Sequence, residues 1–116
     1  MQVRKTKSGK FVAELDWHEC ENLYGWLVSF LETESAALLF VKLDKVENFK
    51  RYGYYYAVNH FFVKYCAKLR SSELKARLTM KSMEAFTLLQ FLWTLELPMG
   101  YLDIANGRSQ LHQLLS

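Results

Sequence analysis

The chain is poor in residues that break or crosslink a backbone. It has one proline, five glycines and two cysteines among 116 residues. It also lacks low-complexity stretches, internal repeats and linker-like segments, so we expect one domain over residues 1–116. Cys20 and Cys66 lie in apolar periodic segments, where a buried free thiol is the expected state.

Long uncharged runs are lacking as well. The longest ones, residues 22–31, 52–63 and 85–95, fall short of the roughly 20 apolar residues that a membrane-spanning helix needs. The basic N-terminus leads into an apolar stretch that Asp16 ends at once, which argues against a secretory signal peptide. We therefore expect a cytoplasmic protein with no membrane partner.

The motifs of common catalytic and metal sites are also missing. The glycines are dispersed, and no Walker or Gly-x-Ser-x-Gly pattern occurs. His18 and Cys20 are two residues apart on a predicted helix, and His60 and Cys66 are six apart, so neither pair points toward one zinc ion. We expect no metal, no cofactor and no catalytic residue.

What the chain does contain is apolar and aromatic side chains, which make up 51% and 16% of its residues. This supply is sufficient for a single continuous core. The net charge is only +3, but residues 42–81 hold ten basic and three acidic side chains between two mildly acidic ends. Such an asymmetry indicates either a polyanionic partner or a solvated helix face.

The first half of the chain predicts a hairpin, a helix, a strand and a second helix. Residues 2–6 and 10–15 flank a turn signal and are typical of a β-hairpin. Asp16 and Glu19 form the pattern of a capping box, which predicts a helix from there to about residue 32. Residues 36–43 are a short apolar run that predicts a buried strand.

A second capping box, Asp44 to Glu47, predicts a helix that continues to Arg70. Gly53 predicts an irregularity within it, because glycine weakens a helix by about 1 kcal/mol. Leu27 and Phe62 are predicted to be deeply buried. The apolar face of this second helix has the following members: Tyr55, Val58, Phe62, Tyr65 and Leu69.

The last third is less clear in its pattern. Residues 74–81 alternate between apolar and polar side chains, as in a half-exposed strand. Residues 83–97 fit either a helix or a buried strand. A turn signal at Asn106 and Gly107 precedes Ser109, which we expect to cap a last short helix to Leu115.

Together these elements predict an α/β or α+β fold. It is a single domain with a mixed sheet of three to five strands, packed helices and an N-terminal β-hairpin. Strand-helix-strand packing gives every apolar face a place in one core.

A candidate basic binding patch comes from one helical row and the polar face of the following strand. Consecutive tyrosines at 54–56 point to different sides of a helix, so at least one belongs to the core, and Tyr56 is left as a stacking surface for bases. The members of the patch are Tyr56, His60, Lys64, Lys68, Lys75, Arg77 and Lys81.

Residues 22–90 resemble part of the diguanylate-cyclase (GGDEF) domain. The strand at 37–44 is similar to that family's first strand with its closing Asp-x-Asp, and residues 48–53 resemble the segment that follows it. Residues 63–70 are similar to its long helix, and residues 82–89 to its signature turn and next strand. The entry motif of the family resembles Leu23-Tyr24-Gly25-Trp26.

The departures from the family pattern concern its catalytic residues. Lys42 stands where the resemblance places the first metal-binding aspartate, and Ala85 stands at the catalytic acid. Asp44 and Glu84 alone keep carboxylates. Two-metal nucleotidyl chemistry needs several carboxylates, so the resemblance implies a degenerate, catalytically inactive domain.

Two functions follow from these observations. The first is a non-catalytic regulatory or protein-interaction module, with a protein partner, self-association or a bound nucleotide. The alternative is a small nucleic-acid-binding domain that uses the basic segment 42–81.

Overall fold

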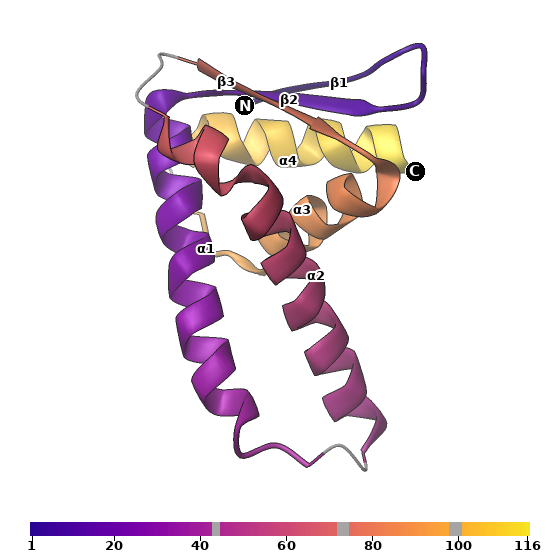
Figure 1. The fold of residues 1–116 in the computed structure, drawn as a ribbon. Coiled ribbons are helices and arrows are strands. Elements are labelled where there is room, and N and C mark those ends of the chain that lie inside the picture. Colours follow the sequence, from indigo (N-terminus) through magenta and orange to yellow (C-terminus); the bar gives the residue numbers. More distant parts are fainter. Residues whose placement is uncertain (43–44, 72–74, 98–100) are drawn as a thin grey trace.

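The computed structural model describes residues 1–42, 45–71, 75–97 and 101–116. It confirms the predicted α/β class and the N-terminal hairpin (Figure 1). Three strands and four helices occur in the described parts. In chain order they are β1 (Gln2–Lys5), β2 (Phe11–Asp16), α1 (Trp17–Leu38), α2 (Val46–Arg70), β3 (Lys75–Met80), α3 (Ser82–Thr94) and α4 (Leu102–Leu115).

The sheet has the order β1-β2-β3, and both pairs are antiparallel. A turn with Gly9 at φ +84° joins β1 to β2, a conformation that glycine adopts without a steric penalty. Side chains alternate along β3, so that Ala76, Leu78 and Met80 face the core and the residues between them face solvent. The strand predicted at 74–81 is therefore confirmed at residues 75–80, and it ends one residue earlier than predicted; residue 74 lies outside the described residues.

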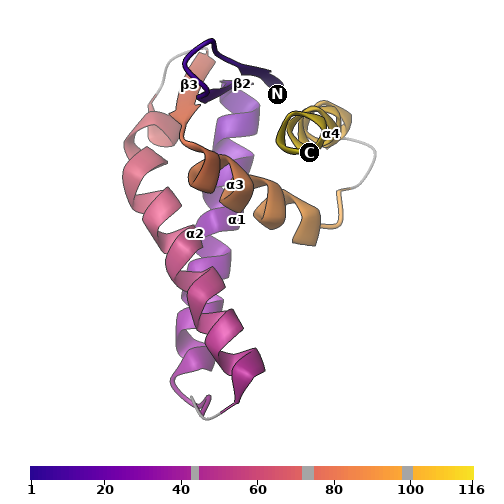
Figure 2. The same ribbon diagram turned by 90° about the vertical axis from the view of Figure 1, so that its right-hand side faces the viewer.

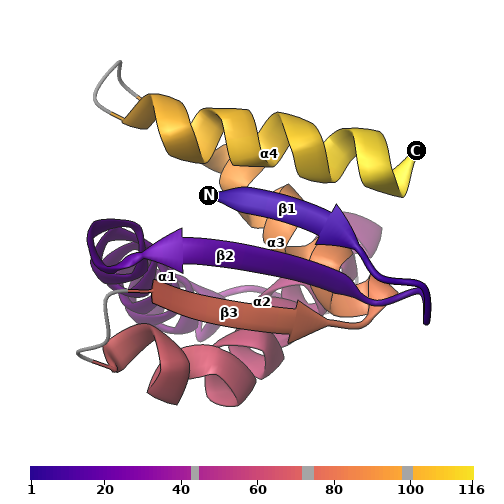
Figure 3. The same cartoon turned by 90° about the horizontal axis from the view of Figure 1, so that it is seen from above.

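The helices cover one face of the sheet and leave the other open. α1 and α2 lie side by side and run away from the sheet, joined at their far end (Figure 1). α3 crosses the helix pair near the sheet, as Figure 2 shows, and packs against both α2 and α4. α4 runs along β1, and no helix of the described residues lies on the opposite face of the sheet (Figure 3).

The capping box predicted at the start of α1 is confirmed. The Glu19 N–H donates to Asp16 Oδ1 at 2.8 Å, and the Asp16 N–H donates to Glu19 Oε1 at 3.1 Å. These bonds satisfy amides that have no partner within the helix. The other carboxylate oxygen of Glu19 binds the N-terminal amine of Met1, so this cap also ties the start of β1 to α1.

The strand predicted at 36–43 is wrong for the residues that the structure describes. Residues 36–38 continue α1, and residues 39–42 are neither helix nor strand. Leu38 is buried seven residues after Leu31, and its carbonyl accepts a 2.7 Å hydrogen bond from the Tyr52 hydroxyl. A short apolar run does not distinguish a strand from the end of a helix, and here packing against α2 decides. The sheet accordingly has no parallel pair among the described strands.

α2 follows its predicted course with two corrections. It begins at Val46 after Lys45, with no side-chain cap, and Asp44 of the predicted capping box lies outside the described residues. The helix passes through Gly53 without a break. On the predicted core face Val58, Tyr65 and Leu69 are buried, as expected.

The deeply buried aromatic residue in the middle of α2 is Phe61, which the sequence pattern did not single out, and not Phe62. Phe61 is 1% exposed, whereas Phe62 is only partly buried and packs on Tyr24 of α1 at 5.5 Å between ring centroids. The prediction of a deeply buried Phe62 is therefore wrong. The prediction for Leu27, which is 1% exposed, is confirmed.

The C-terminal third is more helical than the sequence predicted. Residues 83–97, left open between helix and strand, contain α3 up to Thr94. The turn predicted at Asn106 and Gly107 and the cap predicted at Ser109 are wrong, because α4 runs through all three. Gly107 packs so closely on Met1 that an added Cβ would lie 2.7 Å from the Met1 carbonyl oxygen. Glycine is therefore required here by close approach rather than by a turn.

Candidate interaction surfaces

All seven residues of the predicted basic patch are exposed. Tyr56, His60, Lys64 and Lys68 follow one side of α2, whereas Lys75 and Arg77 lie on the open face of β3 and Lys81 follows that strand. The Lys68 ammonium donates to the Arg77 carbonyl at 3.1 Å, so the end of α2 and β3 are in contact. The structure thus brings part of the patch together.

Lys64 does not contribute a free charge to this patch. Its ammonium lies 2.6 Å from Glu84 Oε2, and the Glu84 side chain is 9% exposed. The second carboxylate oxygen accepts from the Tyr65 hydroxyl at 3.1 Å and from the Lys81 N–H at 2.8 Å. Glu84 therefore joins α2, the end of β3 and the first turn of α3, with both of its oxygens occupied.

The ionisation of this cluster follows from its hydrogen bonds. Burial by itself would raise the pKa of Glu84, but donation from Lys64, the Lys81 N–H and Tyr65 outweighs burial and lowers it. The pKa of Tyr65 is raised, first by burial and then by the neighbouring Glu84 charge. An ionised carboxylate and a neutral phenol are the stable forms, which is typical of a structural network.

Three of the remaining cations line an open groove between the end of α2 and β3. Lys68, Lys75 and Arg77 border this groove of about 570 Å³, together with Glu14 of β2. Arg77 Nη2 lies 3.3 Å from Glu14 Oε1, and Arg4 approaches the same oxygen at 3.9 Å. Glu14 therefore offsets part of the positive charge. Lys75 lies opposite Asp16 in the sheet, but neither Lys68 nor Lys75 forms an ion pair within the described residues.

Lys42 and Glu84, two of the described positions that the GGDEF resemblance singled out, are not brought together. Lys42 is exposed just after α1, at the far end of the helix pair, whereas Glu84 lies in α3 next to the sheet (Figure 1). Asp44 is outside the described residues. Residues 37–42 also lack the strand on which the resemblance begins, so the cyclase-like scaffold stays a prediction without that element.

A second surface lies on the outward side of α2 and is apolar. Phe49, Tyr56 and Val63 are spaced by seven residues, and their exposed fractions are 60%, 63% and 66%. A seven-residue spacing places side chains on one side of a helix. Since the opposite side of α2 is buried in the core, this helix is apolar on two sides. We call these three residues the α2 stripe.

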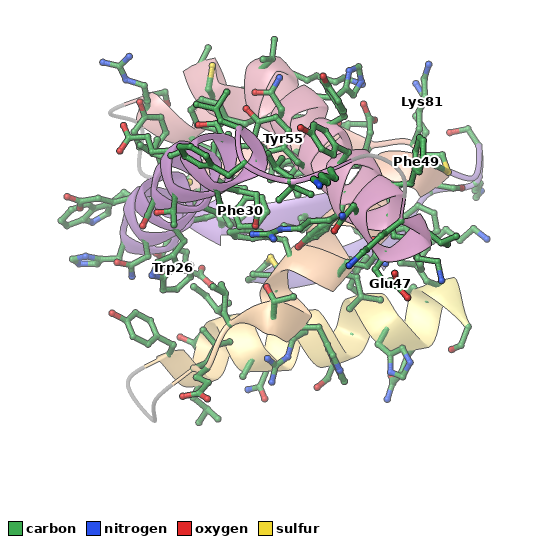
Figure 4. All side chains as sticks on the ribbon, turned by 90° about the horizontal axis from the view of Figure 1, so that it is seen from below. Trp26, Phe30, Glu47, Phe49, Tyr55 and Lys81 are labelled. Carbon is green, nitrogen blue, oxygen red and sulfur yellow. The ribbon has the colours of Figure 1, made fainter. Side chains whose placement is uncertain are left out.

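Other aromatic residues belong to the interior of the helical layer. Trp26 and Phe30 lie on the side of α1 that faces α3 and α4 (Figure 4). Phe30 meets Phe91 of α3 at 5.7 Å between ring centroids, and Trp26 meets Tyr101 at 5.2 Å. These residues are held by the fold, whereas the α2 stripe is exposed.

No protein-family model, no curated protein and no solved structure matches this chain. Its function has to be inferred from its own surfaces.

Two further observations concern the described residues as a whole. Within the described ranges, no three histidine, cysteine, aspartate or glutamate side chains are grouped so as to hold a metal ion. None of the helices in those ranges is both long and apolar enough to cross a bilayer.

Sequence reasoning missed two features of these surfaces. The α2 stripe was visible in the sequence as a seven-residue spacing of large apolar residues, but its exposure was not. The contact of Glu14 with Arg77 depends on the register of β2 with β3, in which these two residues are direct partners. Register is set by the packed face of the sheet and by the turns, so no local pattern revealed it.

Proposed function

We propose that this protein is a non-catalytic protein-interaction module that binds a helix of a partner protein along the α2 stripe. The observation that carries the proposal is the exposure of Phe49, Tyr56 and Val63 at heptad spacing. A large apolar side chain in water gains free energy when a partner covers it, and a seven-residue repeat fits the knobs-into-holes packing of a second helix.

The rings of the stripe are preorganised for such a contact. Tyr56 stacks on Tyr52 with 6.4 Å between the ring centroids, and Tyr52 is held by its hydrogen bond to the Leu38 carbonyl. A side chain that is ordered before binding loses less entropy on binding. In this proposal the protein acts in the cytoplasm, because both cysteines are free, as is typical of reducing compartments. A binding role of this kind requires no cyclase-like scaffold.

Site-specific photo-crosslinking in cells tests the proposal. We expect p-benzoylphenylalanine in place of Tyr56 to form an adduct with a protein, whereas the same group in place of Gln113, which is exposed on α4, forms none. Adding Val63→Glu should abolish the adduct at 56. Equal adducts at both positions, or none at 56, would contradict the proposal.

The groove bordered by Lys68, Lys75 and Arg77 supports a second candidate function, the binding of single-stranded nucleic acid. Basic side chains bind phosphates with a strong dependence on salt, because counterions are released. Lys64 is unsuitable as a test of this function, since it binds the buried Glu84.

Binding of single-stranded DNA or RNA should be measured by fluorescence anisotropy across salt concentrations. The nucleic-acid function predicts that Lys68→Glu with Lys75→Glu abolishes binding. Lys7→Glu with Lys10→Glu, the same change of charge on the exposed hairpin, is the matched control. No binding by the unmodified protein at low salt would exclude this second function.

A further inference from the structure

We infer that the partner of the α2 stripe is α1 of a second copy of this chain, in a two-fold dimer whose two helix pairs form a four-helix bundle. This inference rests on the proposed function and names its partner. Four observations on the two helices carry it.

The first observation is the distribution of charge between the helices. α1 contains four glutamates and no lysine or arginine, whereas α2 contains five basic residues and one acidic residue. Within one chain this difference already produces an ion pair between Glu34 and Arg51. Four of these charges are already paired within the chain. The exposed Glu21 and Glu32 of α1 and the exposed Lys50 and Arg70 of α2 remain for a second copy. Contact of α1 with α2 of that copy joins opposite charges, whereas α1 with α1 or α2 with α2 would oppose like charges.

The second observation is the shape of the outward side of α1. Gly25, Ser29 and Ala36 are exposed on that side and are small, with the exposed carboxylates of Glu21 and Glu32 among them. Small residues let a second helix approach closely and receive large side chains from it. The α2 stripe has the complementary shape, because its three members are large.

The third observation concerns two glycines within these helices. Gly25 in α1 and Gly53 in α2 are both exposed, and a Cβ added at either position would meet nothing within 4 Å. Glycine in an exposed helix interior weakens the helix relative to alanine, and nothing in the chain itself requires it here. Close approach of another backbone accounts for both glycines.

The fourth observation is the length of the two helices, which is sufficient for an extended contact between two copies. At 1.5 Å per residue, α1 of 22 residues and α2 of 25 residues are about 33 Å and 38 Å long. In a two-fold dimer the contact between α1 and the partner's α2 occurs twice, so both stripes are covered and no open end remains for a third copy.

The association of the purified protein should be measured by sedimentation velocity over a wide range of concentration. We expect a monomer–dimer equilibrium. Gly25→Ala and Gly53→Ala should each weaken the dimer at least tenfold, because the added methyl groups separate the helices. The urea midpoint of the same variants, measured where the protein is monomeric, should be unchanged or higher, so weaker association would not be caused by misfolding.

Charge reversal tests the pairing of the helices directly. A chain with Glu21→Lys and Glu32→Lys, and a second chain with Lys50→Glu and Arg70→Glu, should each be monomeric alone. A mixture of the two should form a heterodimer, in which both contacts again join opposite charges. Met83→Lys, at a residue that is 77% exposed on α3, is the control and should leave the dimer unchanged.

A monomer at every concentration would overturn the inference. So would a dimer that Met83→Lys dissociates while the two glycine variants leave it intact, because the interface would then lie on α3. If the protein is monomeric but the photo-crosslink at position 56 captures a different protein, the dimer is wrong and the proposed function stands.

Discussion

Lys64 Nζ and Glu84 Oε2 lie 2.6 Å apart, and this ion pair joins the second half of α2 to the first turn of α3. Lys64 is partly exposed, whereas Glu84 is almost fully buried and accepts two further hydrogen bonds. The contact changes the role assigned to Lys64, which the sequence predicted to be part of a basic binding patch. It is a structural residue, and its partner gives the fold a dependence on pH.

Glu84→Gln should make the stability of the protein less sensitive to acid. The pKa of Glu84 lies below its ordinary value of 4.5 in the folded protein, so the folded state favours the ionised form. The resulting stabilisation is present above about pH 4.5 and is lost as pH falls through the lower, folded pKa. Urea unfolding at pH 7 and pH 3 should show a difference between wild type and Glu84→Gln that shrinks at pH 3. A difference that is constant with pH would refute this assignment.

Substitution by alanine should show that Leu27 and Phe61 are deeply buried and that Phe62 is not. Leu27→Ala is expected to reduce the free energy of unfolding by about 2–5 kcal/mol, and Phe61→Ala by about 3–5 kcal/mol, through lost burial and the cavity left behind. Phe62→Ala should have a smaller effect than Phe61→Ala, since its ring is partly exposed beside Tyr24. Chemical unfolding of the three variants measures this, and a larger loss at Phe62 would show that the two faces are reversed.

Gly107→Ala should destabilise the protein although alanine is the better helix former. The new Cβ would lie 2.7 Å from the carbonyl oxygen and the Cβ of Met1, so β1 and α4 would have to separate. Helix propensity alone would instead stabilise the variant by about 1 kcal/mol. The sign of the change in thermal midpoint, measured where the protein is monomeric, therefore decides, and Gly25→Ala, where a Cβ meets nothing within 4 Å, is the matched control. A rise of the midpoint in both variants would show that Met1 does not pack on Gly107.

We expect no turnover of nucleoside triphosphates in the presence of magnesium. Both oxygens of Glu84 already accept hydrogen bonds from Lys64, Tyr65 and the Lys81 N–H, and Lys42 lies at the other end of the helix pair. Chromatography of the reaction mixture measures the nucleotides. Turnover that disappears in Glu84→Gln would show that the protein is an enzyme.

The sequence by itself determined the elements whose signals are local. The box of Asp16 and Glu19 begins α1 where it was predicted, because both hydrogen bonds close within one turn. Alternation along residues 75–80 predicted a half-exposed strand, and the spacing of Val58, Tyr65 and Leu69 predicted a core face. Each of these patterns depends on which side of one element is buried, and the sequence contains that information.

The tertiary structure alone decided whatever depends on contacts between distant residues. Leu38 extends α1 instead of starting a strand because it packs beside α2, and Gly107 lies within α4 because Met1 leaves room for no larger residue. The ion pair of Lys64 could not be predicted for the same reason, since its partner Glu84 is 20 residues away in the chain. Lys64 is therefore a structural residue and not a free charge of the basic patch. Packing between elements contributes more to the stability of a helix than local propensity does. A pattern along the chain therefore predicts that an element forms, but not which other elements its side chains contact.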